Sequence, residues 1–394
     1  TGKRSGASEV IPYGRQDIRD EDVETVVQVL RSDFLTQGPW VPRFERAVCD
    51  AVGAGYGVAV SSATAALHLA CLALDLGPGD LLWTSPITFV ASANCARYCG
   101  ADVDFVDVDP HTFDLCPVAL ERKLLEAEAA GRLPDVVVPV HLCGQSCDMR
   151  SIHALSQRFG FRIIEDASHA IGGSYDGHPV GACRYSDVTV FSFHPVKIVT
   201  TGEGGMAVTN DAGLAARLER LRSHGITRDA ALMDREPDGP WYYQQLELGL
   251  NYRLTDLQAA LGCRQLERLD AYVTRRAALA DRYDERLAEL PLVLPGRDPL
   301  ARSAWHLYVI RVPRAGEVGR RCVFERLRAA GIGVNVHYIP VHTQPYYRAL
   351  GFAEDAFPNA VAYYNEAISL PMFPTLSDAD QDRVVCEVSR ALSR

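Results

Sequence analysis

Short apolar runs separated by helical segments fill the first half of the chain. Seven runs of this kind are present, and few of them alternate apolar with polar positions. They cover residues 58–60, 81–85, 103–108, 136–140, 162–165, 188–193 and 206–209. Strands that are apolar on both faces are typical of a parallel sheet covered by helices on each side. The pattern therefore predicts an α/β fold built on a mostly parallel seven-stranded sheet.

Apolar positions at helical spacing lie between and around these runs. They predict an N-terminal helix at residues 21–30 and a helix that opens at residues 61–64 and stops at residues 77–79. Pro86 is expected to start a further helix that runs through Tyr98. Other helices are expected at residues 152–159 and 254–269, the second after a polar loop at residues 234–239.

A second, smaller α/β unit follows a stretch rich in proline and glycine at residues 291–299. Residues 305–312 and 332–338 have the composition of strands, and Phe324 and Leu327 lie on a helix between them. We expect a large domain of residues 1–270 and a small C-terminal domain of residues 271–394.

One lysine follows the apolar run 188–193, where the predicted strand gives way to a glycine-rich turn. Lys197 can be desolvated there, which favours the neutral amine that forms a Schiff base. Asp166 ends the predicted strand at residues 162–165. Because ligands gather at the carboxyl ends of strands in a doubly wound sheet, we expect the two side chains to meet. A lysine amine and a carboxylate that pairs with a ring nitrogen are the protein's side of a pyridoxal phosphate site.

Each candidate residue also has a plainer interpretation. Most lysines are solvated, and Asp166 could simply cap the next helix. The helix that opens at residues 61–64 offers free amides to a phosphate, yet a Ser/Thr cap explains it too. Phe89 could lie against a pyridine ring or belong to the core, and His169 could contact the ring's phenolic oxygen or be an interior histidine. The set, rather than any one member, favours the cofactor site.

Composition narrows the class of protein. A chain of 394 residues with 47% hydrophobic and 23% charged residues is typical of a soluble globular protein, and its net charge of −10 argues against nucleic-acid binding. Polar residues break the most apolar window, so no membrane span is expected. No apolar stretch follows Lys3 and Arg4, which argues against a signal peptide. The eleven cysteines show no paired metal-ligand spacing, so free thiols in a cytoplasmic protein are expected, without a metal.

Residues 202–205 are rich in glycine but lack the spacing of a nucleotide-binding fingerprint. We expect this turn to let the backbone pass close to Lys197.

Five segments resemble, in order, the DegT/DnrJ/EryC1/StrS family of sugar aminotransferases, which has the type I fold of pyridoxal phosphate enzymes. They are Ser-Ser-Ala-Thr-Ala-Ala-Leu at 61–67, Thr-Ser-Pro-Ile-Thr-Phe-Val at 84–90, Glu-Asp-Ala-Ser-His-Ala at 165–170, the lysine segment at 192–205 and Asn-Tyr-Arg-Leu-Thr-Asp-Leu-Gln-Ala-Ala at 251–260. Within the family the chain is most similar to UDP-4-keto-6-deoxy-N-acetylhexosamine transaminases of pseudaminic acid synthesis. Residues 223–229, 239–243 and 336–342 carry that closer similarity.

The resemblance implies a role for each matching residue. Lys197 becomes the Schiff-base lysine and proton shuttle, Asp166 the partner of the ring nitrogen, and His169 the neighbour of the ring oxygen. Phe89 stacks on the ring, where relatives have tryptophan. The phosphate ligands implied are Ala63, Thr64, Ser192 and, from the second subunit of a homodimer with shared sites, Asn251. The substrate-binding residues implied are Arg253, His337 and Tyr338.

The implied activity is transfer of an amino group from glutamate, through the pyridoxamine form of the cofactor, to the 4-keto carbon of a UDP- or dTDP-linked 4-keto-6-deoxyhexose. Transfer to a 3-keto sugar nucleotide uses the same residues and stays open, as do the nucleotide and the sugar's stereochemistry. A non-catalytic regulator that binds the cofactor is the alternative of another class. Relatives with histidine in place of the lysine dehydrate their substrate, so Lys197 favours a transaminase.

Overall fold

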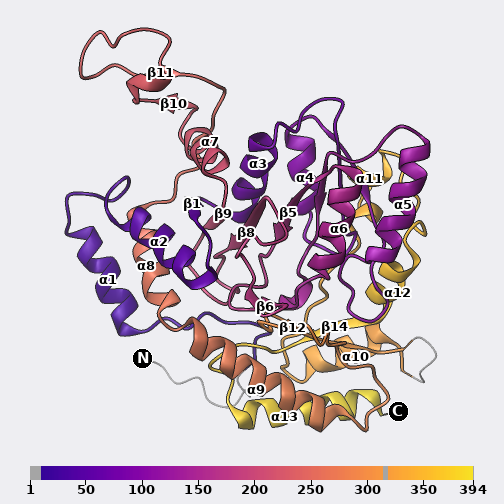
Figure 1. The fold of residues 1–394 in the computed structure, drawn as a ribbon. Helices are drawn as coiled ribbons and strands as arrows, with labels where there is room; N and C mark the ends of the chain where they lie inside the picture. Colours follow the sequence, from indigo (N-terminus) through magenta and orange to yellow (C-terminus); the bar gives the residue numbers. More distant parts are fainter. Residues whose placement is uncertain (1–9, 314–317, 394) are drawn as a thin grey trace.

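A seven-stranded sheet with helices on both faces forms the centre of the molecule (Figure 1). The computed structural model describes residues 10–313 and 318–393, so Lys3 and Arg4 lie outside the described residues. The strands of the sheet are β1 Tyr56–Val60, β2 Leu81–Thr84, β3 Asp102–Phe105, β4 Val136–Val138, β5 Arg162–Asp166, β8 Val188–Ser192 and β9 Gly205–Thr209. Each coincides closely with one of the seven apolar runs, which confirms the predicted α/β class.

The strands follow the order β1-β9-β8-β5-β4-β2-β3 across the sheet. The pairs from β8 to β3 are parallel, while β9 is antiparallel to both β1 and β8. A strand that is antiparallel to β9 runs in the direction of β8, so β1 shares the orientation of the parallel set. Six of the seven strands therefore end at the same edge of the sheet, which confirms the mostly parallel topology.

Helices cover the two faces of this sheet with separate apolar cores. One core joins the sheet to α3, α4 and α7, and the opposite face packs on α2 and α8 at one end and on α5 and α6 at the other. In β1, Val58 and Val60 enter the first core and Ala59 enters the second. Residues of one strand are thus buried on both sides, as its unbroken apolar composition requires.

The helices are α1 Asp20–Leu30, α2 Trp40–Val52, α3 Ala63–Ala73, α4 Ala91–Tyr98, α5 Pro117–Ala129, α6 Met149–Phe159, α7 Ala212–Arg222, α8 Asp256–Leu266, α9 Leu269–Leu287, α10 Arg320–Ala329, α11 Pro345–Arg348, α12 Pro358–Glu366 and α13 Asp378–Leu392. Among the described helices, none combines the length and the apolar character needed to cross a membrane.

The helix expected from Pro86 begins five residues later, at Ala91. Residues 86–90 form a turn instead, in which the Ile87 N–H donates to the Ser85 hydroxyl at 3.3 Å. Short polar side chains that bond to nearby backbone groups compete with helix formation in this way. The turn places Phe89, which is 59% exposed, ahead of the helix.

The C-terminal part has its own apolar core, formed by α9, α10, α13 and the antiparallel pair β13 Tyr308–Arg311 and β14 Ala367–Leu370. Residues 332–338 are not the strand that we expected. They make isolated bridges at Ile332 and Asn335, because the strand that pairs with β13 is β14. Ile11 from the N-terminal segment also enters this core, and the division into domains of residues 1–270 and 271–394 stays a prediction.

Short strand pairs lie outside the main sheet. They are β6 Ser174–Tyr175 with β7 His178–Pro179 and β12 Ala301–Arg302, and the hairpin of β10 Ile226–Thr227 with β11 Gln244–Gln245. The hairpin extends away from the layers near α7 (Figure 1) and carries the predicted loop at residues 234–239. Large apolar side chains on and beside it are exposed, among them Trp241 at 72% and Leu248 at 84%. An apolar projection of this kind is typical of a surface that contacts another protein.

Gly205 opens β9 against the start of α3. A Cβ at Gly205 would overlap the Ser62 carbonyl carbon and the Ala63 nitrogen. We expected the glycine-rich turn to pass close to Lys197; Gly204 lines the same cavity as Lys197, and the backbone that Gly205 approaches is the first turn of α3. Glycine is needed at Gly205 because backbone packs on backbone there.

Candidate active site

A cavity of about 410 Å³ opens at the edge where the parallel strands end. The predicted site residues that line it are Ala63, Thr64, Phe89, Asp166, His169, Ser192, Lys197, His337 and Tyr338. These side chains come from segments far apart in the sequence and meet because β1, β5 and β8 end together. The cavity is therefore the candidate active site.

Lys197 and Asp166 reach the cavity from neighbouring strands. Asp166 is the last residue of β5 and pairs in register with Val190 of the parallel strand β8. Lys197 follows β8 in a turn in which its N–H donates to the His194 carbonyl at 2.9 Å. Burial lowers the pKa of Lys197 to about 8, and the charge of Asp166 opposes part of this shift. An appreciable fraction of the amine is thus neutral near pH 7 to 8, as a nucleophilic lysine requires.

Neutral donors hold both oxygens of Asp166. The Ser92 hydroxyl donates to Oδ2 at 2.6 Å, and the Ser168 N–H donates to Oδ1 at 3.1 Å. The side chain is only 5% exposed, so these bonds fix its orientation at the cavity wall. The plainer interpretation of Asp166 as a helix cap is wrong, because residues 168–172 form turns and the next element is β6, so the Ser168 bond closes a local turn.

His169 is held as a neutral ring with a defined tautomer. Burial and the nearby Lys197 charge keep its pKa well below the usual value. The Cys143 N–H donates to Nδ1 at 3.3 Å, so the proton of the neutral ring is on Nε2. Nε2 lies 3.1 Å from the Tyr338 hydroxyl and donates to it, which leaves the tyrosine proton available to a ligand.

The start of α3 is suited to an anion. Ser62 caps the helix by accepting the Ala65 N–H at 3.1 Å, which confirms the interpretation as a serine cap. Ala63 and Thr64 occupy the first turn, where backbone N–H groups have no partner within the helix. Both residues line the cavity together with Ser192, and the positive end of the helix dipole points toward it.

Sequence reasoning missed several cavity residues. Tyr13 comes from the N-terminal segment, and His306 precedes β13 in a stretch that we had expected to be strand. His306 is 4% exposed, its ring lies 4.4 Å from that of His169, and its Nδ1 has no hydrogen-bond partner. Burial and the neighbouring positive charges keep the pKa of His306 well below its usual value, so the ring is neutral.

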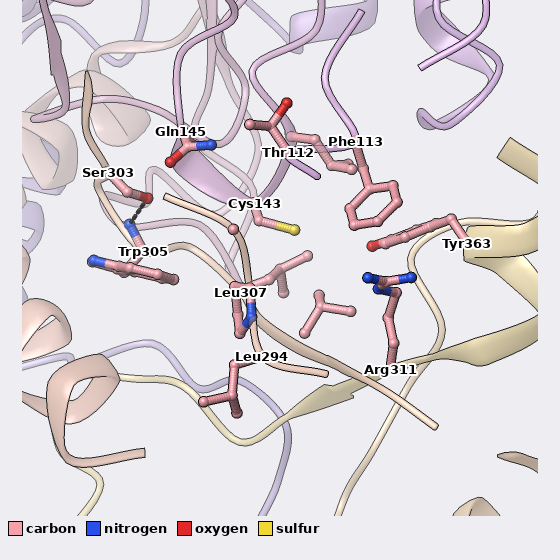
Figure 2. Close-up of a pocket in the computed structure, with 14 residues that line it drawn as sticks. Thr112, Phe113, Cys143, Gln145, Leu294, Ser303, Trp305, Leu307, Arg311 and Tyr363 are labelled. Atoms are coloured by element: carbon pink, nitrogen blue, oxygen red, sulfur yellow. Dashed lines mark hydrogen bonds between the residues drawn. The ribbon is translucent and has the colours of Figure 1, made fainter. Parts of the chain in front are cut away.

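A smaller cavity of about 40 Å³ lies beside the loop that contains Cys143 (Figure 2). Figure 2 shows the Cys143 thiol pointing toward Phe113, Tyr363 and Arg311, and the Arg311 guanidinium lies 4.7 Å over the Phe113 ring. A space of this size holds a few water molecules and no substrate. Because the Cys143 backbone binds His169, the small cavity belongs to the packing that supports the larger site.

Comparisons with known proteins agree with this arrangement. The sequence model described as the DegT/DnrJ/EryC1/StrS aminotransferase family matches residues 16–389. The chain belongs to this family. The spore coat polysaccharide biosynthesis protein SpsC of Bacillus subtilis (strain 168) is 41% identical over 379 residues, which cover 95% of each chain.

Solved structures of the family share the fold. The PMP form of Spr1654 from Streptococcus pneumoniae is 31% identical, has a TM-score of 0.88 and covers 97% of this chain and 99% of its own. PseC of Helicobacter pylori, an aminotransferase involved in the biosynthesis of pseudoaminic acid, is 28% identical with a TM-score of 0.88 and covers 98% of this chain and 99% of its own. These structures confirm the type I fold that the sequence predicts for this aminotransferase family member.

Two predicted residues lie outside the cavity of their own chain. Asn251 is exposed and forms a bridge with Ser223, while Arg253 is half-buried and forms a bridge with Val60. Neither residue lines the large cavity. Their roles toward the phosphate and the substrate stay predictions.

The chain has three lysines, Lys3, Lys123 and Lys197, which makes the ionisation of Lys197 directly measurable. Competitive labelling with acetic anhydride, read by peptide mass, should give Lys197 a pKa of about 8. Because the Asp166 charge raises that pKa, Asp166→Asn should lower it further. Lys123, whose amine pairs with Asp104 at 2.6 Å, is the internal control and should not move. An unperturbed Lys197, or an upward shift in the variant, would contradict the desolvated site.

Proposed function

We propose that the protein is a pyridoxal phosphate-dependent aminotransferase that moves an amino group from glutamate to the 4-keto carbon of a UDP- or dTDP-linked 4-keto-6-deoxyhexose. The observation that carries this proposal is the pair of Lys197 and Asp166 at one cavity wall, with the Lys197 pKa lowered to about 8. The family supports the amino transfer, and the cofactor forms in which Spr1654 has been solved, PLP and PMP, support the cofactor.

The residues of the cavity fit pyridoxal phosphate. The first turn of α3 with Ala63, Thr64 and the nearby Ser192 suits the phosphate, and the glycine start of β9 keeps that turn free of side-chain atoms. Asp166 suits a protonated ring nitrogen, and Phe89 offers an exposed ring at the wall. When bound, the cofactor supplies the carbonyl carbon that receives the amino group and a ring that takes up the electron pair left by the departing proton.

The chain itself supplies binding, orientation and proton movement. Lys197 Nζ, as a partly neutral amine, can take the proton from the carbon of glutamate that carries the amino group and can deliver a proton in the reverse half with the sugar. Asp166 holds the proton on the ring nitrogen throughout. His169, fixed by the Cys143 N–H, donates to the Tyr338 hydroxyl, so that Tyr338 can present its own proton to an oxygen atom of a ligand. Burial of these groups excludes water and strengthens each interaction.

The 4-keto position is favoured over the 3-keto position by similarity alone. Residues 223–229, 239–243 and 336–342 match the 4-aminotransferase subgroup, and the fold resembles that of PseC. His337 and Tyr338 belong to the last of these segments and line the cavity, which supports their proposed contact with the sugar. A regulator without catalytic activity has no need for an amine of lowered pKa at the end of β8.

We infer that two chains share each active site in a homodimer. Asn251 and Arg253 match family positions for the partner's site and do not line the cavity of their own chain. The exposed apolar hairpin of β10 and β11 provides surface for such an interface. In a two-fold dimer both sites are completed together.

Glutamate and a panel of UDP- and dTDP-linked 4-keto-6-deoxy sugars test the reaction directly. Mass spectrometry should detect one sugar whose keto group has been replaced by an amine, together with 2-oxoglutarate. Lys197→Ala should lower turnover by at least about 10²- to 10⁴-fold, because the acid–base group is lost. Amination of a 3-keto sugar instead would correct the position, and a fully active Lys197→Ala would refute the mechanism.

Subunit complementation tests the shared site. Inactive Lys197→Ala chains are mixed with inactive Asn251→Ala chains under conditions in which subunits exchange. If Asn251 serves the neighbouring site, each heterodimer holds one site with both defects and one intact site, so activity returns. Absence of recovery after demonstrated exchange would place Asn251 in the site of its own chain.

A further inference from the structure

Two buried hydroxyl groups stand in line behind Asp166. The Ser92 Oγ lies 2.6 Å from Asp166 Oδ2, and the Thr88 Oγ1 lies 2.7 Å from the Ser92 Oγ. Thr88 is 2% exposed and Ser92 is fully buried. Both come from one short segment, since Thr88 lies in the turn before α4 and Ser92 lies in the first turn of that helix. The late start of α4 therefore brings two hydroxyls to the end of β5.

The direction of each hydrogen bond follows from the carboxylate. An ionised Asp166 accepts only, so the single hydroxyl proton of Ser92 goes to Oδ2. Ser92 then has no proton left for Thr88, and the Thr88 hydroxyl must donate to Ser92. Both O–H groups therefore point toward Asp166, the Thr88 hydroxyl to Ser92 and the Ser92 hydroxyl to the carboxylate. Hydrogen bonds aligned in this way polarise and strengthen one another.

Neutral donors hold the Asp166 carboxylate by hydrogen bonds, while the charge of Lys197 acts on it without an ion pair. Among the described residues, no arginine or lysine forms an ion pair with Asp166. Its side-chain hydrogen bonds come from the Ser92 hydroxyl on Oδ2 and the Ser168 N–H on Oδ1. A cation bonded to the carboxylate would compete with a ring N–H for it, whereas these neutral donors leave one lone pair on each oxygen free.

We propose that Ser92 and Thr88 are positioning residues that hold the Asp166 carboxylate in a fixed orientation, so that the proton it shares with the cofactor stays on the ring nitrogen. This inference rests on the proposed function. The plainer alternative is that Ser92 only supports the start of α4. Its contact with the Phe89 carbonyl is 3.4 Å long, against 2.6 Å to Asp166, so the carboxylate is the main partner.

Ser92→Ala and Thr88→Val remove one hydroxyl each, and valine keeps the shape of threonine. Ser156→Ala is the matched control, because Ser156 on α6 is also buried and donates a 2.8 Å bond to the His153 carbonyl, away from the cavity. NMR of bound pyridoxal phosphate with an isotope-labelled ring nitrogen reports the ring proton independently of activity. We expect a protonated nitrogen in the wild type and in Ser156→Ala, and a signal shifted toward the unprotonated value in Ser92→Ala.

The half-reaction with glutamate supplies the second measurement. Ser92→Ala should lower its rate by about 10- to 100-fold with little change in KM, since a hydrogen bond to a charged group is lost. Thr88→Val should cause a smaller loss in the same direction. Because Thr88 acts through Ser92, the double variant should lose no more than Ser92→Ala alone. Additive losses would show that Thr88 acts directly on a ligand and would overturn the proposed series of hydrogen bonds from Thr88 through Ser92 to Asp166, which we call the relay.

The outcomes separate this inference from the proposed function. If Ser92→Ala keeps the ring nitrogen protonated and reacts like Ser156→Ala, the relay is wrong and the aminotransferase assignment stands. If Ser92→Ala does not fold, the ring-nitrogen signal of Thr88→Val decides, and an unshifted signal overturns the relay. If the wild type neither binds pyridoxal phosphate nor reacts with glutamate, the proposed function fails and this inference fails with it.

Discussion

The parallel pairing of β5 with β8 determines where the reactive groups of this protein lie. The register that places Asp166 beside Val190 brings the ends of both strands to one edge, so that Ser192 and the turn with Lys197 face the Asp166 carboxylate. Because β1 runs in the same direction, α3 begins at that edge as well. The layers of helices on both faces then keep water from the strands and allow a polar site to form inside an apolar frame.

Burial of polar groups sets the chemistry of that site, and its effect differs between the amine, the imidazoles and the carboxylate. Desolvation makes Lys197 a better nucleophile and keeps His169 and His306 neutral. Asp166 is also buried, and it accepts hydrogen bonds from the Ser92 hydroxyl and the Ser168 N–H. The site thus combines a carboxylate, a partly neutral amine and neutral imidazoles within one cavity, which is the set of charges that amino transfer through a pyridine ring requires.

The sequence was informative where one local rule decides the structure. Short, mostly apolar runs identified all seven strands, and residues at or after strand ends, such as Asp166 and Lys197, could be assigned to one edge by topology. The structure at positions that depend on tertiary packing could not be predicted from the sequence. Ser92 was overlooked because the start of α4 was placed at Pro86. Residues 332–338 were expected to be a strand, but they make only isolated bridges, and β13 pairs with β14. His306 had no local signal, since crossing segments bring it to His169.

The central claim is that Lys197 and Asp166 act on one pyridoxal phosphate molecule, and covalent trapping tests it most directly. The protein is loaded with the cofactor, reduced with borohydride, digested and analysed by mass spectrometry. Since the chain has three lysines, the assignment is unambiguous. The account predicts that the cofactor mass is found on the peptide that contains Lys197 and is lost when glutamate is added before reduction. Trapping on Lys123, or trapping on Lys197 that glutamate leaves unchanged, would contradict it.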